Sequence, residues 1–124
     1  MASSVKQLIE AANALVPRVS PAEATSLIAT HQALLVDVRD APEVANSGQI
    51  AGSLHVSRGL LEFRADPESP LHDPRFSRER PVIVYCASGG RAALAGKTLK
   101  DLGYEQVFNL GAFKDWPADD GAAA

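Results

Sequence analysis

The sequence contains a single cysteine, Cys86, placed between an apolar segment and a segment of helical periodicity. Residues 82–85 are β-branched or aromatic, which is typical of a strand buried on both faces. Small and aliphatic residues recur at helical spacing over 92–102, and Gly103 is placed to end that helix. A loop between the carboxyl end of a parallel strand and a helix N-terminus offers free N–H groups to an anion. A thiol placed there is expected to ionise more readily than a free one.

The loop between these two elements is expected to bind an anion. Its residues after the cysteine are Ala87, Ser88, Gly89, Gly90 and Arg91. Consecutive glycines cost backbone entropy, which is acceptable where successive N–H groups converge on a bound group. A cation in the first helical turn opposes the helix dipole by about 0.3–1 kcal/mol, so Arg91 is interpreted as a ligand-binding residue. The alternatives are that Arg91 is simply solvated and that the cysteine is a small buried hydrophobic residue.

Three further charged residues follow predicted strands. Asp37 and Arg39 lie at the carboxyl end of a strand predicted over 34–38, where a site would collect charged groups. They either line the mouth of the site or form a structural ion pair that holds neighbouring loops, and the structural interpretation is favoured. Arg58 follows a short strand predicted over 54–56 and is a candidate donor-binding residue, with a solvated position at a helix start as the alternative.

The other elements are predicted from periodicity, capping residues and turn residues. Helices are expected over about 4–16, from the capping box at Ser20 to about residue 29, over 41–47 and within 57–63. An edge strand over 17–19, a surface loop over 66–81 and a final strand over 106–110 complete the pattern, with Trp116 packed against the body and 118–124 frayed. Strands that alternate with helices predict an α/β domain with a parallel sheet covered on both faces.

Length and composition limit the functional classes. A chain of 124 residues is expected to form one domain, with its core over about 17–117. The formal net charge of −3 argues against a nucleic acid or an anionic membrane as partner. No apolar run is long enough to span a membrane. One cysteine and an N-terminus unlike a secretory signal favour a cytoplasmic protein. His31, His55 and His72 show no metal-ligand spacing, so no metal site is expected.

Three motifs together resemble those of the single-domain rhodanese family. Residues 37–43, Asp-Val-Arg-Asp-Ala-Pro-Glu, are similar to the family's Asp-x-Arg-x-x-x-Glu segment. Residues 48–53, Gly-Gln-Ile-Ala-Gly-Ser, resemble its Gly-His-Ile-Pro-Gly-Ala turn, and 86–91 resemble its active-site loop. Gln49, Ala51 and Ala112 depart from the usual family residues. The resemblance implies a five-stranded parallel sheet between helices, with the cysteine loop at the carboxyl end of a central strand.

The resemblance also implies a function, thiosulfate sulfurtransfer. The Cys86 thiolate would attack the outer sulfur of thiosulfate or a similar anionic donor, and a persulfide would remain on Cys86. Cyanide or a thiol, such as glutathione or thioredoxin, would then accept the sulfur. The N–H groups of 87–91 would hold the charge of the terminal sulfur, and Arg91 would orient the donor. No metal or organic cofactor is implied.

Two other functions stay open at this point. The chain could be a persulfide carrier or a sulfur-sensing module with little turnover. A phosphatase or arsenate reductase is less favoured, because the related enzymes of that type use Cys-x5-Arg to hold a tetrahedral oxyanion. Here four residues separate Cys86 from Arg91, which predicts a smaller cradle suited to a single sulfur atom.

Overall fold

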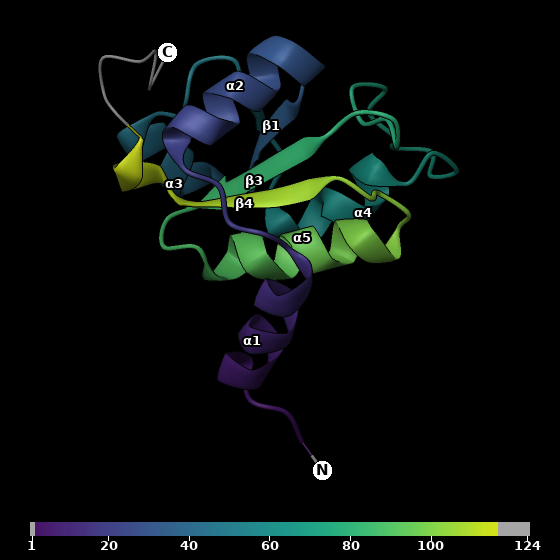
Figure 1. Cartoon of the computed structure of the whole chain (residues 1–124). Coiled ribbons are helices and arrows are strands. Elements are labelled where there is room, and N and C mark those ends of the chain that lie inside the picture. Colours follow the sequence, from purple (N-terminus) through teal and green to yellow (C-terminus); the bar gives the residue numbers. More distant parts are fainter. Residues whose placement is uncertain (1, 117–124) are drawn as a thin grey trace.

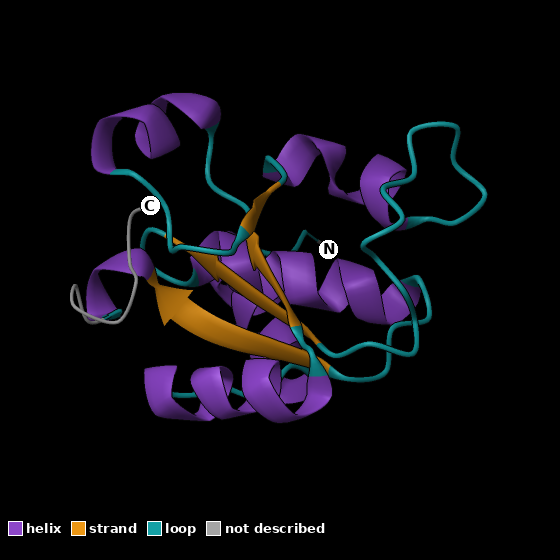
Figure 2. Ribbon diagram, turned by 90° about the horizontal axis from the view of Figure 1, so that it is seen from above, coloured by secondary structure: helices purple, strands orange, loops and turns teal. Residues whose placement is uncertain are grey.

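The sheet consists of four parallel strands with helices on both of its faces (Figures 1 and 2). The computed structural model describes residues 2–116. The strands, in the spatial order β2-β1-β3-β4, are β1 (Leu34–Asp37), β2 (Leu54–His55), β3 (Val82–Cys86) and β4 (Val107–Ala112). The α-helices are α1 (Val5–Leu15), α2 (Pro21–His31), α3 (Ala41–Ser47), α4 (Leu61–Ala65) and α5 (Gly90–Asp101), and the 3-10 helices are η1 (Arg58–Leu60) and η2 (Phe113–Asp115). The predicted α/β architecture is confirmed.

The expected fifth strand is absent from the described residues, so that part of the prediction is wrong. Residues 17–19 make only an isolated parallel bridge between Arg18 and Asn109. The Val19 amide donates to the Asn109 carbonyl at 3.1 Å, and the Asn109 amide donates to the Pro17 carbonyl at 2.9 Å. Pro17 has no N–H and α2 already begins at Pro21, so the segment is too short to extend the ladder. The predicted frayed tail, 118–124, lies outside the described residues.

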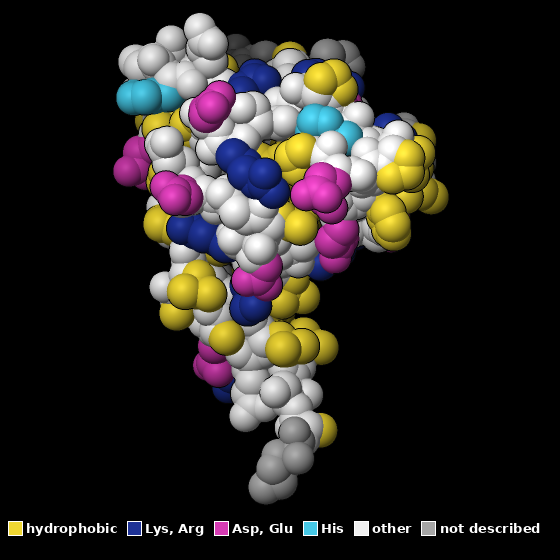
Figure 3. Space-filling model, turned by 90° about the vertical axis from the view of Figure 1, so that its right-hand side faces the viewer, with side chains coloured by type: hydrophobic (Ala, Val, Ile, Leu, Met, Phe, Trp, Pro, Cys, Tyr) yellow, Lys and Arg dark blue, Asp and Glu magenta, His cyan; other side chains and the backbone are white. Residues whose placement is uncertain are grey.

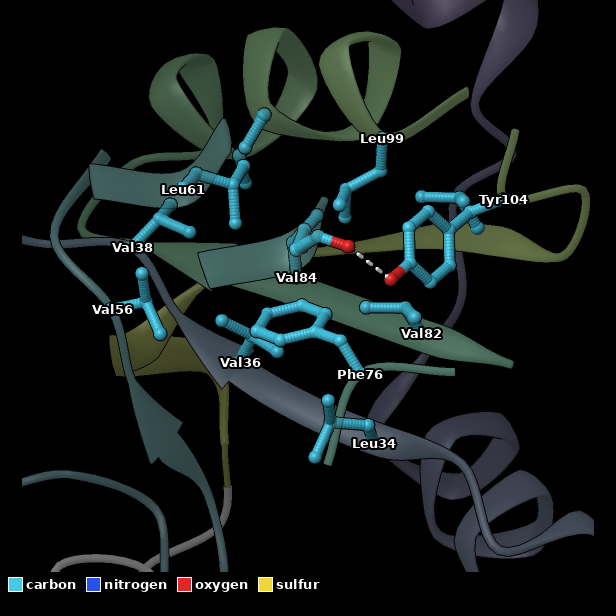
Figure 4. Close-up of a cluster of buried hydrophobic side chains, with 14 of the residues drawn as sticks. Leu34, Val36, Val38, Val56, Leu61, Phe76, Val82, Val84, Leu99 and Tyr104 are labelled. Carbon is cyan, nitrogen blue, oxygen red and sulfur yellow. Dashed lines mark hydrogen bonds between the residues drawn. The ribbon is translucent and has the colours of Figure 1, made fainter. Parts of the chain in front are cut away.

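Each face of the sheet carries its own hydrophobic core. On the face toward α5, aliphatic side chains of β1 and β3 pack against Leu61, Phe76, Leu99 and Tyr104 (Figure 4). The Tyr104 hydroxyl donates to the Ala65 carbonyl at 2.6 Å, which satisfies the one polar atom of that ring. On the face toward α2, the core includes Trp116, as predicted. The fold therefore fixes β3 between two packed layers.

The register of β3 against β4 determines what lies beside the cysteine. Val84 pairs with Asn109, but Tyr85 pairs with Gly111 and Cys86 with Ala112, so one extra residue of β4 is accommodated there. All five residues of β3 are buried. The irregularity brings a glycine alongside the carboxyl end of the central strand.

Helix α1 projects below α5 and packs against it (Figure 1). Its capping box joins Ser4 and Gln7. Val5, Leu8 and Leu15 are exposed, and hydrophobic side chains gather on the projecting lower part of the face in Figure 3. On the same face, basic and acidic side chains are intermixed. Among the described residues, no helix combines the length and the hydropathy needed to cross a lipid bilayer.

Candidate active site

The Cys86 sulfur lies at the centre of the loop that joins β3 to α5. The residue has no exposed surface. Its Sγ accepts hydrogen bonds from the backbone N–H groups of Gly89, at 3.0 Å, and Ala92, at 3.3 Å. Within residues 2–116, the N–H groups of Ser88, Gly90 and Arg91 have no acceptor. The loop is thus a cradle of donors with spare capacity for one more acceptor atom.

Gly89 gives the cradle its shape. Its φ of 105° lies in the left-handed region, which a glycine adopts without steric cost. Its carbonyl accepts from the Ala93 amide at 3.0 Å and, at 3.4 Å, from Nδ2 of Asn109. The two bonds to this carbonyl fix the peptide unit that it shares with the Gly90 N–H, one of the groups without an acceptor, while the Gly89 N–H of the preceding peptide unit donates to Sγ.

Sequence reasoning missed Asn109. The residue is 1% exposed, and its Oδ1 has no hydrogen-bond partner within the described residues. A buried amide oxygen without a hydrogen bond is destabilising. The hydrogen bond from Nδ2 to the Gly89 carbonyl offers a compensating role for Asn109, the positioning of the cysteine loop. The available signal was one polar residue in the apolar segment 107–110.

Arg91 forms a two-point ion pair with Glu43. Its Nη1 and Nη2 donate to the two carboxylate oxygens of Glu43 at 2.6 and 2.8 Å, and Asp40 lies 3.9 Å away. The hydrogen bond from Arg91 is the main cause that lowers the pKa of Glu43 to about 2, and the same contact raises the pKa of Arg91. The predicted role of Arg91 in orienting a donor stays a prediction, and its charge is largely compensated by the Glu43 carboxylate.

Asp37 and Arg39 form a buried pair that ties two loops together. The Arg39 Nη2 donates to Asp37 Oδ2 at 2.7 Å and to the Gly48 carbonyl at 2.6 Å, and its Nη1 donates to the Ser47 hydroxyl at 2.7 Å. The hydrogen bond to Asp37 raises the pKa of Arg39. Its guanidinium also lies 4.2 Å from the ring centre of Phe113. These contacts clamp the end of β1 to the end of α3 and to η2, as the structural interpretation expects. Arg39 also lines the pocket beside the loop, so a role at the mouth of the site stays a prediction.

Arg58 lies with α4 and α5. It donates to Glu62 at 2.9 Å and to the Thr98 hydroxyl at 2.8 Å. It does not contribute to the pocket described below, and its predicted donor-binding role stays a prediction.

An open pocket of about 360 Å³ adjoins the cysteine loop at Ala87. The residues that line it are Arg39, Glu43, Asn46, Ser47, Ala87, Phe113 and Lys114. Phe113 and Lys114 of η2 were not predicted, because nothing in their local sequence distinguishes them from ordinary loop residues. The pocket offers one aromatic surface and one exposed cation to a molecule that approaches the loop.

A buried tyrosine, Tyr85, lies against two of the pocket-lining residues, with its ring centre 6.1 Å from that of Phe113 and 5.8 Å from the Arg39 Cζ. The Tyr85 hydroxyl accepts from the Ile50 amide at 3.1 Å and lies 3.1 Å from the Ser53 hydroxyl, and burial raises its pKa to about 12. Gln49 Nε2 donates to the Ser53 carbonyl at 2.9 Å, so the departure from the family residue at 49 still closes the turn. Among residues 2–116, no group of three His, Cys, Asp or Glu side chains is placed to hold a metal ion.

The fold and site together define an α/β domain that holds one cysteine in a cradle of backbone N–H groups at the carboxyl end of a central strand. The model of the rhodanese-like domain matches residues 20–119, and the chain belongs to this family of sulfurtransferase-related domains. The resemblance inferred from the three motifs is thereby confirmed.

The chain is similar over most of its length to two proteins named as sulfurtransferases and to one solved structure. The chain is 33% identical to the human thiosulfate:glutathione sulfurtransferase, over 81% of this chain and 92% of that one. It is 28% identical to the thiosulfate sulfurtransferase GlpE of Tolumonas auensis, over 80% and 86%. A solved structure from Rhodopseudomonas palustris, described as a protein of unknown function and a possible tyrosine phosphatase, is 34% identical. It superposes with a TM-score of 0.87 over 100% of this chain and 96% of its own.

Proposed function

We propose that the protein is a thiosulfate sulfurtransferase that carries a sulfane sulfur on Cys86. The observation that carries the proposal is the cradle: two N–H groups bond to Sγ, and three more lack an acceptor within the described residues. A persulfide adds one sulfur atom that bears negative charge, and such an atom needs donors aimed at it.

The reaction divides into two displacements. The Cys86 thiolate attacks the outer sulfur of thiosulfate, the bond between the two thiosulfate sulfurs breaks, and sulfite leaves with the electron pair of that bond. The persulfide anion left on Cys86 is held by the free N–H groups of the loop. An acceptor nucleophile then attacks the outer sulfur, and the Cys86 thiolate is released. Both steps conserve atoms and charge without a metal or an organic cofactor.

The acceptor is proposed to be cyanide or a small thiol. A relative with 33% identity is named for transfer from thiosulfate to glutathione, which supports a thiol acceptor of that kind. The open pocket beside Ala87 provides room for a molecule larger than cyanide. A protein thiol such as thioredoxin is the other acceptor to be compared.

The proposal is tested by intact-mass analysis after addition of thiosulfate. We expect the wild-type protein to gain one sulfur atom that cyanide or glutathione removes, and Cys86→Ser to gain none while keeping its circular dichroism spectrum. Steady-state assays with cyanide, glutathione and thioredoxin then rank the acceptors. Full turnover by Cys86→Ser would contradict the mechanism.

A carrier function is distinguished by the same experiment. A persulfide that forms on Cys86 but is not passed on to any of the three acceptors would favour a carrier or sensor over an enzyme. Turnover with parallel-line kinetics, which indicates a ping-pong cycle, would favour the sulfurtransferase.

A phosphatase is the alternative raised by the description of the Rhodopseudomonas relative. A phosphatase of the Cys-x5-Arg type uses the arginine of the cysteine loop itself on the phosphate oxygens, whereas Arg91, the arginine of this shorter loop, is bonded to Glu43 by two short hydrogen bonds. We therefore expect no hydrolysis of p-nitrophenyl phosphate under conditions in which the persulfide forms. Phosphatase turnover without sulfur transfer would reverse this order of preference.

A further inference from the structure

Arg18 lies directly beside the cysteine loop, although it is 68 residues before Cys86 in the chain. Its backbone is fixed by the bridge to Asn109 in β4. A methyl group added to Gly111 would lie 2.9 Å from the Arg18 Cζ and overlap the guanidinium, and one added to Gly89 would lie 3.9 Å from its Nη1. The guanidinium therefore rests over two glycines, one in the loop and one at the adjacent position of β4.

Among the residues that the structure describes, no carboxylate compensates the charge of Arg18. Within residues 2–116, no carboxylate lies within ion-pair distance of Arg18 and no hydrogen bond engages its side chain. Arg91, by contrast, is bonded to Glu43, and Arg39 is bonded to Asp37. Of these three arginines near the loop, Arg18 is the one whose charge is not paired with a carboxylate of the described residues and can attract an anion from solution.

We infer that Arg18 is the side chain that attracts the anionic donor and contacts its oxygens, a role that the sequence suggested for Arg91. The inference rests on the proposed function and assigns donor recognition to a residue outside the cysteine motif. The outer sulfur of thiosulfate enters the cradle, while the three oxygens, which carry the charge that leaves with sulfite, point out toward the guanidinium. Arg18 is thus a donor-binding residue that acts on the first displacement and not on the second.

Lys114 is the competing cation. It is exposed and lines the open pocket on η2. Its ammonium is a point charge on a long flexible stem, whereas the guanidinium of Arg18 is seated against two glycines and presents a planar array of donors. Both variants are therefore compared in the same experiment.

The test separates donor binding from sulfur transfer. In a Cys86→Ser background, which cannot react, binding of thiosulfate is measured by titration of backbone amide NMR signals at low ionic strength. We expect Arg18→Gln to weaken binding roughly three- to tenfold and Arg18→Lys to weaken it less. Lys114→Gln and the control Arg64→Gln, a charge loss on α4, should each change binding less than about twofold.

In the reactive protein, Arg18→Gln should raise KM for thiosulfate by the same factor and leave kcat at saturating thiosulfate nearly unchanged. Added salt should weaken thiosulfate binding to the wild-type protein more than binding to Arg18→Gln, because salt screens the charge that the variant lacks. Equal affinities of Arg18→Gln and its parent, a larger effect of Lys114→Gln, or no shift of the loop amides with thiosulfate would overturn the inference. If Arg18→Gln binds thiosulfate more weakly but the wild-type protein forms no persulfide, Arg18 is an anion-binding residue and the proposed sulfurtransferase function is wrong.

Discussion

Arg91 and Glu43 form a two-point ion pair that joins the first turn of α5 to the first turn of α3. The two residues are 48 positions apart in the chain. The Asp40 amide also donates to Glu43 Oε2 at 3.0 Å, so the carboxylate is oriented by its own helix before it meets the arginine. The pair braces the end of the cysteine loop against a separate part of the fold.

Replacing Glu43 with Gln should therefore lower the free energy of unfolding by about 1 kcal/mol at neutral pH, a figure reduced for the partly exposed position of the pair. Because the pKa of Glu43 is lowered from 4.5 to about 2 in the folded protein, this contribution is complete above about pH 4.5 and is lost as the pH falls to about 2. Urea unfolding of both proteins across this range measures it. Glu62→Gln, which removes the carboxylate of a surface pair, is the control; a pH-independent difference for Glu43→Gln would contradict the assignment.

Substitution of Asn109 should affect activity more than stability. In Asn109→Leu, the anchor on the Gly89 carbonyl is lost, and we expect sulfur transfer to slow about tenfold as the loop loses its orientation. The free energy of unfolding should change by less than about 1 kcal/mol, because the same substitution removes an unsatisfied oxygen. Asn13→Leu, on the exposed side of α1, is the matched control. A stability loss proportional to the activity loss would assign Asn109 a purely structural role.

Gly111→Ala should be strongly destabilising. The residue has a φ of 95°, in the left-handed region, which costs an alanine about 1–3 kcal/mol, and a methyl group there would also displace the end of the Arg18 side chain. Gly59 is the control, because a methyl group at that position meets no atom within 4 Å. Thermal unfolding of the two alanine variants measures the difference. Equal melting temperatures would show that neither the positive φ at residue 111 nor the displaced Arg18 side chain is costly.

Asp37→Asn tests the buried clamp. Removal of one charge leaves Arg39 buried without its carboxylate partner, which typically costs about 3–5 kcal/mol. Asp73→Asn removes the partner of the exposed Arg75 and should cost less than about 1 kcal/mol. Chemical denaturation of the two variants provides the comparison. A small effect of Asp37→Asn would indicate that Gly48 and Ser47 alone hold the arginine.

Much of the fold could be predicted because its signals are local. Ser20 and Glu23 begin α2 with a capping box, β3 is a continuous apolar segment, and β1 is apolar up to its last residue, Asp37. Even the short helix α3 has its predicted bounds, since Gly48 ends it. The prediction of a fifth strand was wrong because it came from the family pattern. In this chain Pro17 lacks an N–H and α2 begins at Pro21, so residues 17–19 form only a single bridge.

The site was less predictable because contacts between distant segments decide which of its charged side chains are paired and which are free to bind a ligand. Cys86 and its glycines are recognised from a local motif. In contrast, the partner of Arg91 lies in α3, and the place of Arg18 beside the loop depends on a bridge to β4. A side chain's local position shows that a charge is present, but only the assembled fold shows whether another charge neutralises it.

The complete burial of the cysteine sulfur has a kinetic consequence. With no exposed surface at Cys86, a reagent reaches the thiol only when the loop departs from its closed arrangement. The rate of reaction with a neutral alkylating agent should therefore level off at the opening rate of the loop as the reagent concentration rises. The thiol is in this sense shielded from adventitious oxidants, and its own modification rate reports how often the protein opens to a donor.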